Sequence, residues 1–219
     1  MTSSPYSTAS LKSAYGRNRW NGLQLATIDP VANMPEIRTL ACIDLLEVKG
    51  QSAPLLVLST DVRTPKVSQI LANPRVQVLW WFGDTHEQFR ISGVASIVAA
   101  PGTPTYDSLK DKINLPGDVD LETKRVEVFN AMPNYMSHYL RPTWGTPLRK
   151  APHSETWPKV TLPTENSSDE DKLHYEEALK NFSLIVIEPV VVDYRSQQER
   201  VVSKKLDNGL WENEPVVMP

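Results

Sequence analysis

Residues 55–93 constrain the fold most, because strand-forming runs, a polar turn and helix-ending residues follow one another there in a fixed order. The run LLVLST that opens this stretch is apolar and rich in strand-forming residues. A Thr-Pro pair at residues 64–65 favours the beginning of a helix, and an Asn-Pro pair at residues 73–74 favours its end. Residues 76–81 and 88–92 show the two-residue alternation of strands. The stretch therefore predicts a strand, a short helix and two further strands.

The turn between the predicted strand and helix gathers the hydroxyls and cations of Thr60, Arg63, Thr64 and Lys66. The free N–H groups and the dipole at a helix N-terminus favour an anion, and phosphate is the natural one beside such side chains. A plainer interpretation stays open, in which Thr64 only caps the helix and the cations are solvated. The spacing alone does not decide between the two.

The residues before this stretch predict a strand pair. Residues 23–29 alternate as a strand does, residues 30–35 make a hairpin-like connection, and a second strand runs from residue 36 to about residue 48. Arg38 lies on this second strand, and its planar guanidinium suits bidentate contact with phosphate oxygens. Cys42 is expected to be a small buried hydrophobic residue.

The rest of the chain predicts helices, a loop and C-terminal strands. Pro189 interrupts the last apolar run and favours a sheet edge or a β-bulge there. The predicted helices are residues 11–18, 103–111, 121–131, 134–140 and 169–180, with an exposed loop at residues 150–168. The predicted strands are residues 182–194 and 199–205, followed by a tail from residue 210.

The composition of the 219-residue chain excludes several classes of protein. Hydrophobic residues make up 40% and charged residues 22%, which is typical of globular proteins. A formal net charge of −3 offers no basic field for nucleic acid. The single cysteine excludes an internal disulfide, and the four histidines lack metal-binding spacing, so no metal site is predicted. No apolar run suits a membrane helix; we expect a cytoplasmic protein, with the nucleus as an additional compartment.

Several segments stand in an order that matches a known family. They read TDVRTPK at residues 60–66, NP at 73–74 and EQFRISG at 87–93. This series resembles the FMN-binding core of the pyridoxamine 5'-phosphate oxidase family, whose pattern is Thr-Asn-x-x-Ser-Arg-Lys, Asn-Pro and Arg-Gln-x-Arg-x-x-Gly. The N-terminal strand pair, the C-terminal strands and the closing Trp211 follow the family as well. Residues 140–148, LRPTWGTPL, resemble an insertion in the cyanobacterial-type branch.

The resemblance implies a fold and an assembly. The expected fold is mainly β (α+β), an FMN-binding split β-barrel of antiparallel strands with peripheral helices. Residues 1–219 would form one domain, with a helical insertion at about 103–148 and a loop and helix at about 150–180. The expected assembly is a homodimer that binds FMN at the subunit interface and acts on a small-molecule substrate.

The resemblance also implies an activity and its residues. The expected reaction is the oxidation of pyridoxamine or pyridoxine 5'-phosphate with O2, as in vitamin B6 salvage and pyridoxine biosynthesis, with Arg200 on the substrate side. The expected FMN-binding residues are Arg38, Thr39, Ser59, Thr60, Arg63, Thr64, Lys66, Gln88, Tyr194 and Lys204.

Three positions depart from the family pattern. Ile43 replaces a lysine, Val202 replaces a histidine, and Pro65 replaces a phosphate-binding arginine for which Arg63 is a hypothetical substitute. Each unmade charged hydrogen bond costs on the order of 1.5–3 kcal/mol. FMN binding is therefore better supported than vitamin B6 oxidation. The alternatives are another flavin enzyme, a non-catalytic FMN carrier or sensor, and a barrel that has lost FMN.

Overall fold

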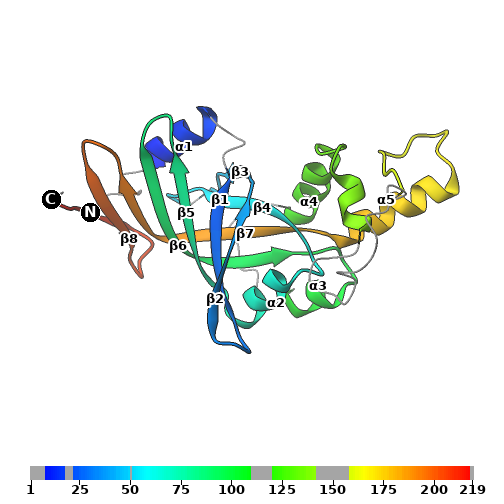
Figure 1. Cartoon of the computed structure of the whole chain (residues 1–219), viewed down its shortest axis with the longest axis horizontal. Coiled ribbons are helices and arrows are strands. Elements are labelled where there is room, and N and C mark those ends of the chain that lie inside the picture. Colours follow the sequence, from blue (N-terminus) through cyan, green and yellow to red (C-terminus); the bar gives the residue numbers. More distant parts are fainter. Residues whose placement is uncertain (1–7, 18–21, 50, 110–119, 142–157, 218–219) are drawn as a thin grey trace.

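A computed structural model describes residues 8–17, 22–49, 51–109, 120–141 and 158–217. Strands dominate these residues and helices lie around them, which confirms the predicted mainly β fold class (Figure 1). The helices are α1 (Thr8–Arg17), α2 (Pro65–Ala72), α3 (Pro104–Leu109), α4 (Leu121–Asn130), the 3-10 helix η1 (Met136–Leu140) and α5 (Asp169–Asn181). The strands are β1 (Leu23–Asp29), β2 (Met34–Leu40), β3 (Cys42–Leu46), β4 (Leu55–Asp61), β5 (Arg75–Phe82), β6 (Glu87–Val98), β7 (Phe182–Arg195), β8 (Arg200–Lys205) and β9 (Trp211–Pro215).

One antiparallel sheet organises the molecule. Its strand order is β2-β1-β5-β6-β7-β4-β3, and β8 and β9 extend it from β7. The long strand β7 pairs with β6 along most of its length, with β4 over its first half and with β8 over its second half. In Figure 1 it spans the molecule from α5 to the β8–β9 hairpin. Elements at opposite ends of β7 are therefore far apart within one chain.

Pro189 lies where β7 stops pairing with β4 and begins to pair with β8, and the sequence predicts a sheet edge or a β-bulge there. The pairing with β4 ends at Ile187 and that with β8 begins at Val191, and the register with β6 shifts between Ser92 and Gly93. A Cβ atom on Gly93 would lie 2.6 Å from the carbonyl oxygen of Glu188, so only glycine fits. The bulge is confirmed.

Two hydrophobic cores lie on opposite faces of β4 and β7. On β4, Leu56 and Leu58 point into the inner core, which α1 and α2 close. Leu55 and Val57 point into an outer core, which also contains residues of α4, η1 and α5. Because successive side chains on a strand point to opposite faces, the same strand contributes to both cores. The opposite end of that face, on β5, β6 and β8, lies beyond the outer core and carries exposed side chains.

The predicted strand from residue 36 to about residue 48 is wrong as a single element. It begins at Met34 and breaks at Ala41, giving β2 and β3. The break has a physical cause, because β2 pairs with β1 whereas β3 pairs with β4 on the other side of the barrel. Cys42, directly after the break, is buried as predicted. Burial raises the pKa of its thiol to about 12.

The predicted helices are found with small shifts in their ends. The segment at 134–140 forms a 3-10 helix from residue 136 instead of an α-helix. Parts of the predicted insertion and of the loop, residues 110–119 and 142–157, lie outside the described residues. Among the helices of the described part, none has the length and apolar character needed to cross a membrane.

Candidate functional site

A cluster of hydroxyls and one ammonium group lies where β4 leads into α2. The hydroxyl oxygens of Thr60 and Thr64 are 3.2 Å apart, and Lys66 Nζ donates to Thr64 Oγ1 at 3.0 Å. Thr64 occupies the N-cap position of α2, but its side chain makes no capping hydrogen bond. Its hydroxyl donates to the carbonyl of Asp61 instead. The interpretation of Thr64 as only a cap is therefore wrong, and its hydroxyl contacts Thr60 and Lys66.

Arg38 reaches the same helix from β2. Its guanidinium donates to Thr27 Oγ1 at 2.5 Å, to Gln69 Oε1 at 2.9 Å and to Glu36 Oε2 at 3.1 Å. Gln69 is 1% exposed and also accepts from Thr27, so a buried amide on α2 fixes the orientation of the guanidinium. Burial lowers the pKa of Arg38, while the charge of Glu36 acts to raise it. Arg38 is thereby held beside Gln69, near the middle of α2.

The charge balance around Lys66 favours an anion. We refer to four residues as the phosphate cluster: Arg38, Thr60, Thr64 and Lys66. Burial lowers the pKa of Lys66, and the positive charge of Arg38 lowers it further, whereas Asp61 acts in the opposite direction. Within the described ranges, no carboxylate forms an ion pair with Lys66. A half-buried ammonium beside a guanidinium, two hydroxyls and a helix N-terminus matches the donors that hold a phosphate group. The residues present fit the phosphate of FMN.

Three predicted cofactor residues lie away from this cluster. Arg63 pairs through two nitrogens with Asp61, at 2.9 and 2.6 Å, and also donates to backbone carbonyls of the insertion. Ser59 lies on the opposite face of β4 from Thr60, within hydrogen-bonding reach of Tyr139. Thr39 is exposed on the outward side of β2. The structure does not bring these three side chains together with Lys66.

A second group of predicted residues lies on the outward face of the sheet, at the other end of β7. Arg200 pairs with Asp193 through two hydrogen bonds of 3.0 and 2.9 Å, and Arg90 binds the same carboxylate. Burial alone would raise the pKa of Asp193, but the hydrogen bonds from Arg200 and Arg90 outweigh it and lower that pKa. Two guanidiniums thus share one carboxylate. Gln88 lies on this same outward face of β6.

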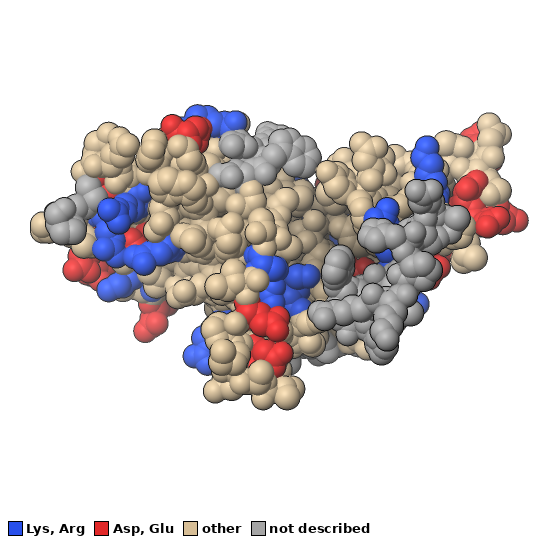
Figure 2. Space-filling model, in the orientation of Figure 1, with Lys and Arg blue, Asp and Glu red and all other residues tan. Residues whose placement is uncertain are grey.

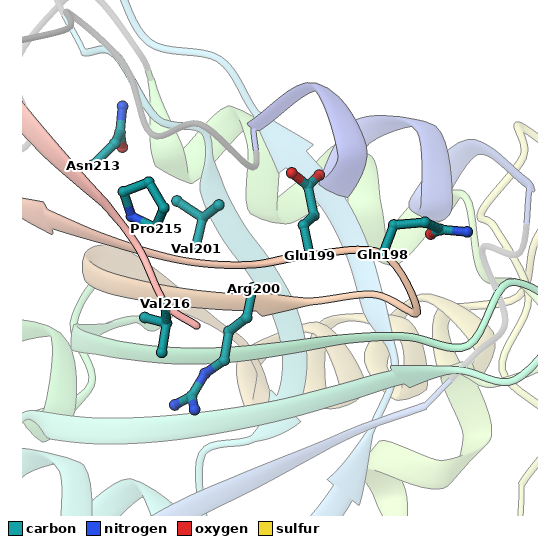
Figure 3. Close-up of a pocket in the computed structure, with 7 residues that line it drawn as sticks. All are labelled: Gln198, Glu199, Arg200, Val201, Asn213, Pro215 and Val216. Carbon is teal, nitrogen blue, oxygen red and sulfur yellow. The ribbon is translucent and has the colours of Figure 1, made fainter. Parts of the chain in front are cut away.

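The surroundings of Arg200 are open. A pocket of about 500 Å³ runs along the β8–β9 hairpin, and Arg200 is among its lining residues (Figure 3). In Figure 3 the Arg200 side chain points to the opposite side of the hairpin from Val201 and Pro215. Lys204 is 3.8 Å from Glu214 and is exposed. Figure 2 shows basic side chains gathered at this end of the molecule.

Tyr194 does not share this face. Its ring packs on Phe89 in the inner core, with the centroids 5.0 Å apart, and its hydroxyl donates to Glu87 at 3.0 Å. Arg17 of α1 donates to the other oxygen of Glu87 at 2.6 Å. Within one chain, Tyr194 therefore helps to fasten α1 to the sheet and is directed away from Arg200.

The two groups of site residues are separated by most of β7. Thr60 pairs with Ser183 near one end of this strand, and Arg200 pairs with Arg195 at the other. At about 3.3 Å per residue, the two ends are on the order of 40 Å apart along the strand. One chain therefore does not assemble all the predicted residues around one ligand. Thr27, Gln69 and Arg90 were not predicted as site residues from the sequence. Of these, Arg90 could have been found, because it lies two residues after Gln88 and therefore on the same face of the strand.

Comparison with known protein families finds a match in the N-terminal part of the chain. Residues 5–99 match the model of a family described as pyridoxamine 5'-phosphate oxidase, FMN-binding domain. The match covers less than half of the chain, so the finding is a similarity of this stretch to that FMN-binding domain. The resemblance recognised in the sequence is thus confirmed, and so is FMN as the cofactor of the matched domain. The matched region includes the phosphate cluster and Gln88, but not β7, β8 or β9.

Similar proteins agree with this assignment. Pyridoxine/pyridoxamine 5'-phosphate oxidase 2 of Arabidopsis thaliana is 25% identical over 173 residues, which cover 78% of this chain and 71% of the relative. A pyridoxamine 5'-phosphate oxidase-related, FMN-binding protein of Nostoc punctiforme superposes with a TM-score of 0.69 at 23% identity, covering 97% of each chain. PhzG of Burkholderia lata gives a TM-score of 0.52 at 15% identity, covering 96% of this chain and 89% of PhzG.

These likenesses confirm the expected split-barrel fold with peripheral helices. The matched family and the Arabidopsis relative are both named for oxidases, which agrees with the expectation of an FMN-dependent oxidoreductase.

Proposed function

We propose that the protein is an FMN-dependent oxidoreductase that holds the FMN phosphate between Arg38, Thr60, Thr64 and Lys66. The observation that carries the proposal is the half-buried Lys66 ammonium, which contacts a hydroxyl and forms no carboxylate ion pair within the described part of the chain. Burying such a charge without a counter-charge is costly, and a bound phosphate removes that cost.

A second copy of the chain completes the site. The outward face of the sheet exposes Ile37 (69%), Leu79 (39%) and Trp81 (45%) beside Gln88 and Arg200. An apolar patch of this kind, bordered by polar side chains, suits an isologous interface. In such a homodimer, Gln88, Lys204 and Arg200 of one subunit approach the phosphate cluster of the other. This arrangement accounts for the separation of the two groups within one chain.

The division of roles follows from these contacts. Bound FMN would supply the hydride acceptor and the means of reducing O2. Arg38 and Lys66 anchor the phosphate, and Gln69 holds the Arg38 guanidinium in place. Gln88 can both donate to and accept from the edge of the ring. Arg200, held by Asp193, presents a positive charge to the substrate.

The proposed substrate is pyridoxamine or pyridoxine 5'-phosphate. The Arabidopsis relative is named for this chemistry, and two guanidiniums around the single carboxylate of Asp193 leave a net positive charge for a substrate phosphate. With pyridoxamine 5'-phosphate, O2 and water the products are pyridoxal 5'-phosphate, ammonia and hydrogen peroxide.

The alternative is an FMN-binding protein without this oxidase activity, either another flavin oxidase or reductase or a non-catalytic carrier or sensor. Two positions favour it. Ile43 packs against the outer core, and Val202 lies in the sheet opposite Asp193 and Glu214, so neither supplies a cation to a phosphorylated substrate.

The experiment is to purify the protein, record its visible spectrum and measure peroxide formation from pyridoxamine 5'-phosphate. Flavin absorption with peroxide supports the proposed reaction. Flavin absorption without peroxide favours the alternative. A protein that acquires no flavin absorption even with added FMN contradicts both.

A further inference from the structure

We propose that Arg63 is a positioning residue that fastens the phosphate loop, residues 61–64, to the helical insertion. Its role would be to hold Thr64 in place for the FMN phosphate rather than to bind the phosphate itself. This inference rests on the proposed function only in assigning a phosphate to the cluster, because the contacts of Arg63 stand on their own.

The contacts of Arg63 run in two directions. Towards its own loop, Arg63 Nε and Nη2 donate to the two oxygens of Asp61 at 2.9 and 2.6 Å, and its backbone N–H donates to the same carboxylate at 2.8 Å. Towards the insertion, Nη2 donates to the backbone oxygens of Tyr139 and Arg141, each at 2.9 Å. The Arg63 guanidinium therefore joins its own loop to two residues of the insertion, which lie 76 and 78 positions later in the chain.

A second bridge reinforces the first. Asn181, the last residue of α5, donates from its side chain to the same Tyr139 oxygen at 2.8 Å and accepts from the backbone N–H of Val62 at 2.8 Å. The Tyr139 ring is packed edge-on against Phe182, with the centroids 5.0 Å apart. The end of η1 is thus held by the packing of Tyr139 against the outer core and by hydrogen bonds from the side chains of Arg63 and Asn181. A loop tied to such a segment is restrained in turn.

The restraint reaches the phosphate cluster within one residue. Thr64 donates from both its backbone N–H and its hydroxyl to the carbonyl oxygen of Asp61, at 3.1 and 2.7 Å. That hydroxyl is the one that Lys66 contacts. Loss of the Arg63 side chain would release Asp61, and Thr64 would then lose the fixed carbonyl group to which it donates. Binding sites of this kind depend on side chains that orient the contacting ones.

The substitution Arg63→Lys separates positioning from direct contact. Lysine keeps the positive charge, but one ammonium cannot reproduce a two-point pair with Asp61 together with two carbonyl contacts. We expect Arg63→Lys to weaken FMN binding about tenfold and to leave riboflavin binding unchanged, as loss of about one to two hydrogen bonds would do. Backbone hydrogen exchange in flavin-free protein should accelerate at residues 61–64 and 136–141. Arg75→Lys, at an exposed position on β5, is the control.

Retention of FMN affinity in Arg63→Lys, with loss in Arg63→Gln, would show direct contact through charge and overturn the proposal. Unchanged exchange at residues 136–141 would also overturn it. Should Arg63→Lys unfold, Asn181→Ala removes the second donor to Tyr139 and is expected to shift exchange and FMN affinity in the same direction; no shift would contradict the proposal. Wild-type protein that does not prefer FMN to riboflavin would refute the phosphate site itself, whereas the exchange result would still report on the bridge.

Discussion

Lys66 illustrates how a side chain can favour binding while disfavouring folding. Burial and the neighbouring Arg38 lower its pKa, so the charged form is less favourable in the folded, ligand-free chain than in the unfolded one. The unfolded state therefore holds the proton more readily. The unfavourable contribution persists at neutral pH and disappears as pH rises from the lowered pKa towards the ordinary value of about 10.4.

We predict that Lys66→Met weakens FMN binding by about 10- to 100-fold, the equivalent of losing one charged hydrogen bond to phosphate. The flavin-free variant should unfold in urea at the same or a higher concentration than the wild type at pH 7, with the difference shrinking at alkaline pH. Lys172→Met, at an ion pair on the surface of α5, should change neither property. A variant that loses stability but keeps FMN affinity would assign Lys66 a structural role instead.

At the residue scale, the sequence predicted which residue types form the phosphate cluster better than it predicted where each side chain points. Thr60, Thr64 and Lys66 were predicted from the turn and lie together. The direction of Arg63 depends on carbonyls of η1 far along the chain, which no local spacing reveals. Gln69 was missed for the same reason, because its partners Thr27 and Arg38 come from other strands.

At the scale of elements, the bulge in β6 and β7 determines which side chains face outward. The extra residue near Pro189 lets the outward face continue from the helix-covered half of β7 to the open half. The close approach of Gly93 to Glu188 makes this bend possible.

We predict that Gly93→Ala destabilises the protein by about 1–3 kcal/mol, because the added methyl would lie 2.6 Å from a backbone oxygen that cannot move freely. The free energy of unfolding in urea measures this. Gly16→Ala is the matched control, since nothing lies within 4 Å of an added methyl there. In a helix that change should stabilise by about 0.5–1 kcal/mol. Equal effects at both positions would contradict the close approach.

Arg125 joins the insertion to the sheet. It is 2% exposed, and its guanidinium donates to the carbonyl oxygens of Leu179 at 2.6 Å and Phe182 at 2.9 Å, at the junction of α5 and β7. We predict that Arg125→Met costs about 2–4 kcal/mol of stability, because it leaves two carbonyl groups without this donor. Lys124→Met on the same helix should cost less than about 1 kcal/mol. Thermal or urea unfolding tests both; similar losses would refute the buried role.

Elements with strong alternation were predicted well. The alternation predicted strand β5, and the structure shows that this strand places Trp80 in the core and Trp81 at the surface. The break at Ala41 was not predicted, because it depends on β2 and β3 pairing with different strands. Local pattern determines the strand, whereas the distant partner determines where it ends.

At the scale of the whole molecule, β7 keeps the phosphate cluster and Arg200 apart. A homodimer brings them together only if the exposed outward face forms the interface. This is why the proposed function depends on assembly as well as on side-chain chemistry.

We predict that Ile37→Lys combined with Trp81→Lys converts a dimer to a monomer and abolishes stable FMN retention, because charges would be buried in the interface. Sedimentation velocity gives the oligomeric state. Leu173→Lys is the control, since Leu173 is 61% exposed on α5, away from this face. A monomeric wild type that retains FMN, or a double variant that remains a dimer, would contradict the interface.

A comparison of FMN with riboflavin isolates the phosphate contact, because the two flavins differ only in the phosphate that the cluster around Lys66 is proposed to hold. Quenching of flavin fluorescence gives both dissociation constants. We predict that FMN binds at least about 100-fold more tightly, as two or more charged hydrogen bonds to phosphate require. Equal affinity for the two flavins, or binding of neither, would contradict the proposed phosphate site.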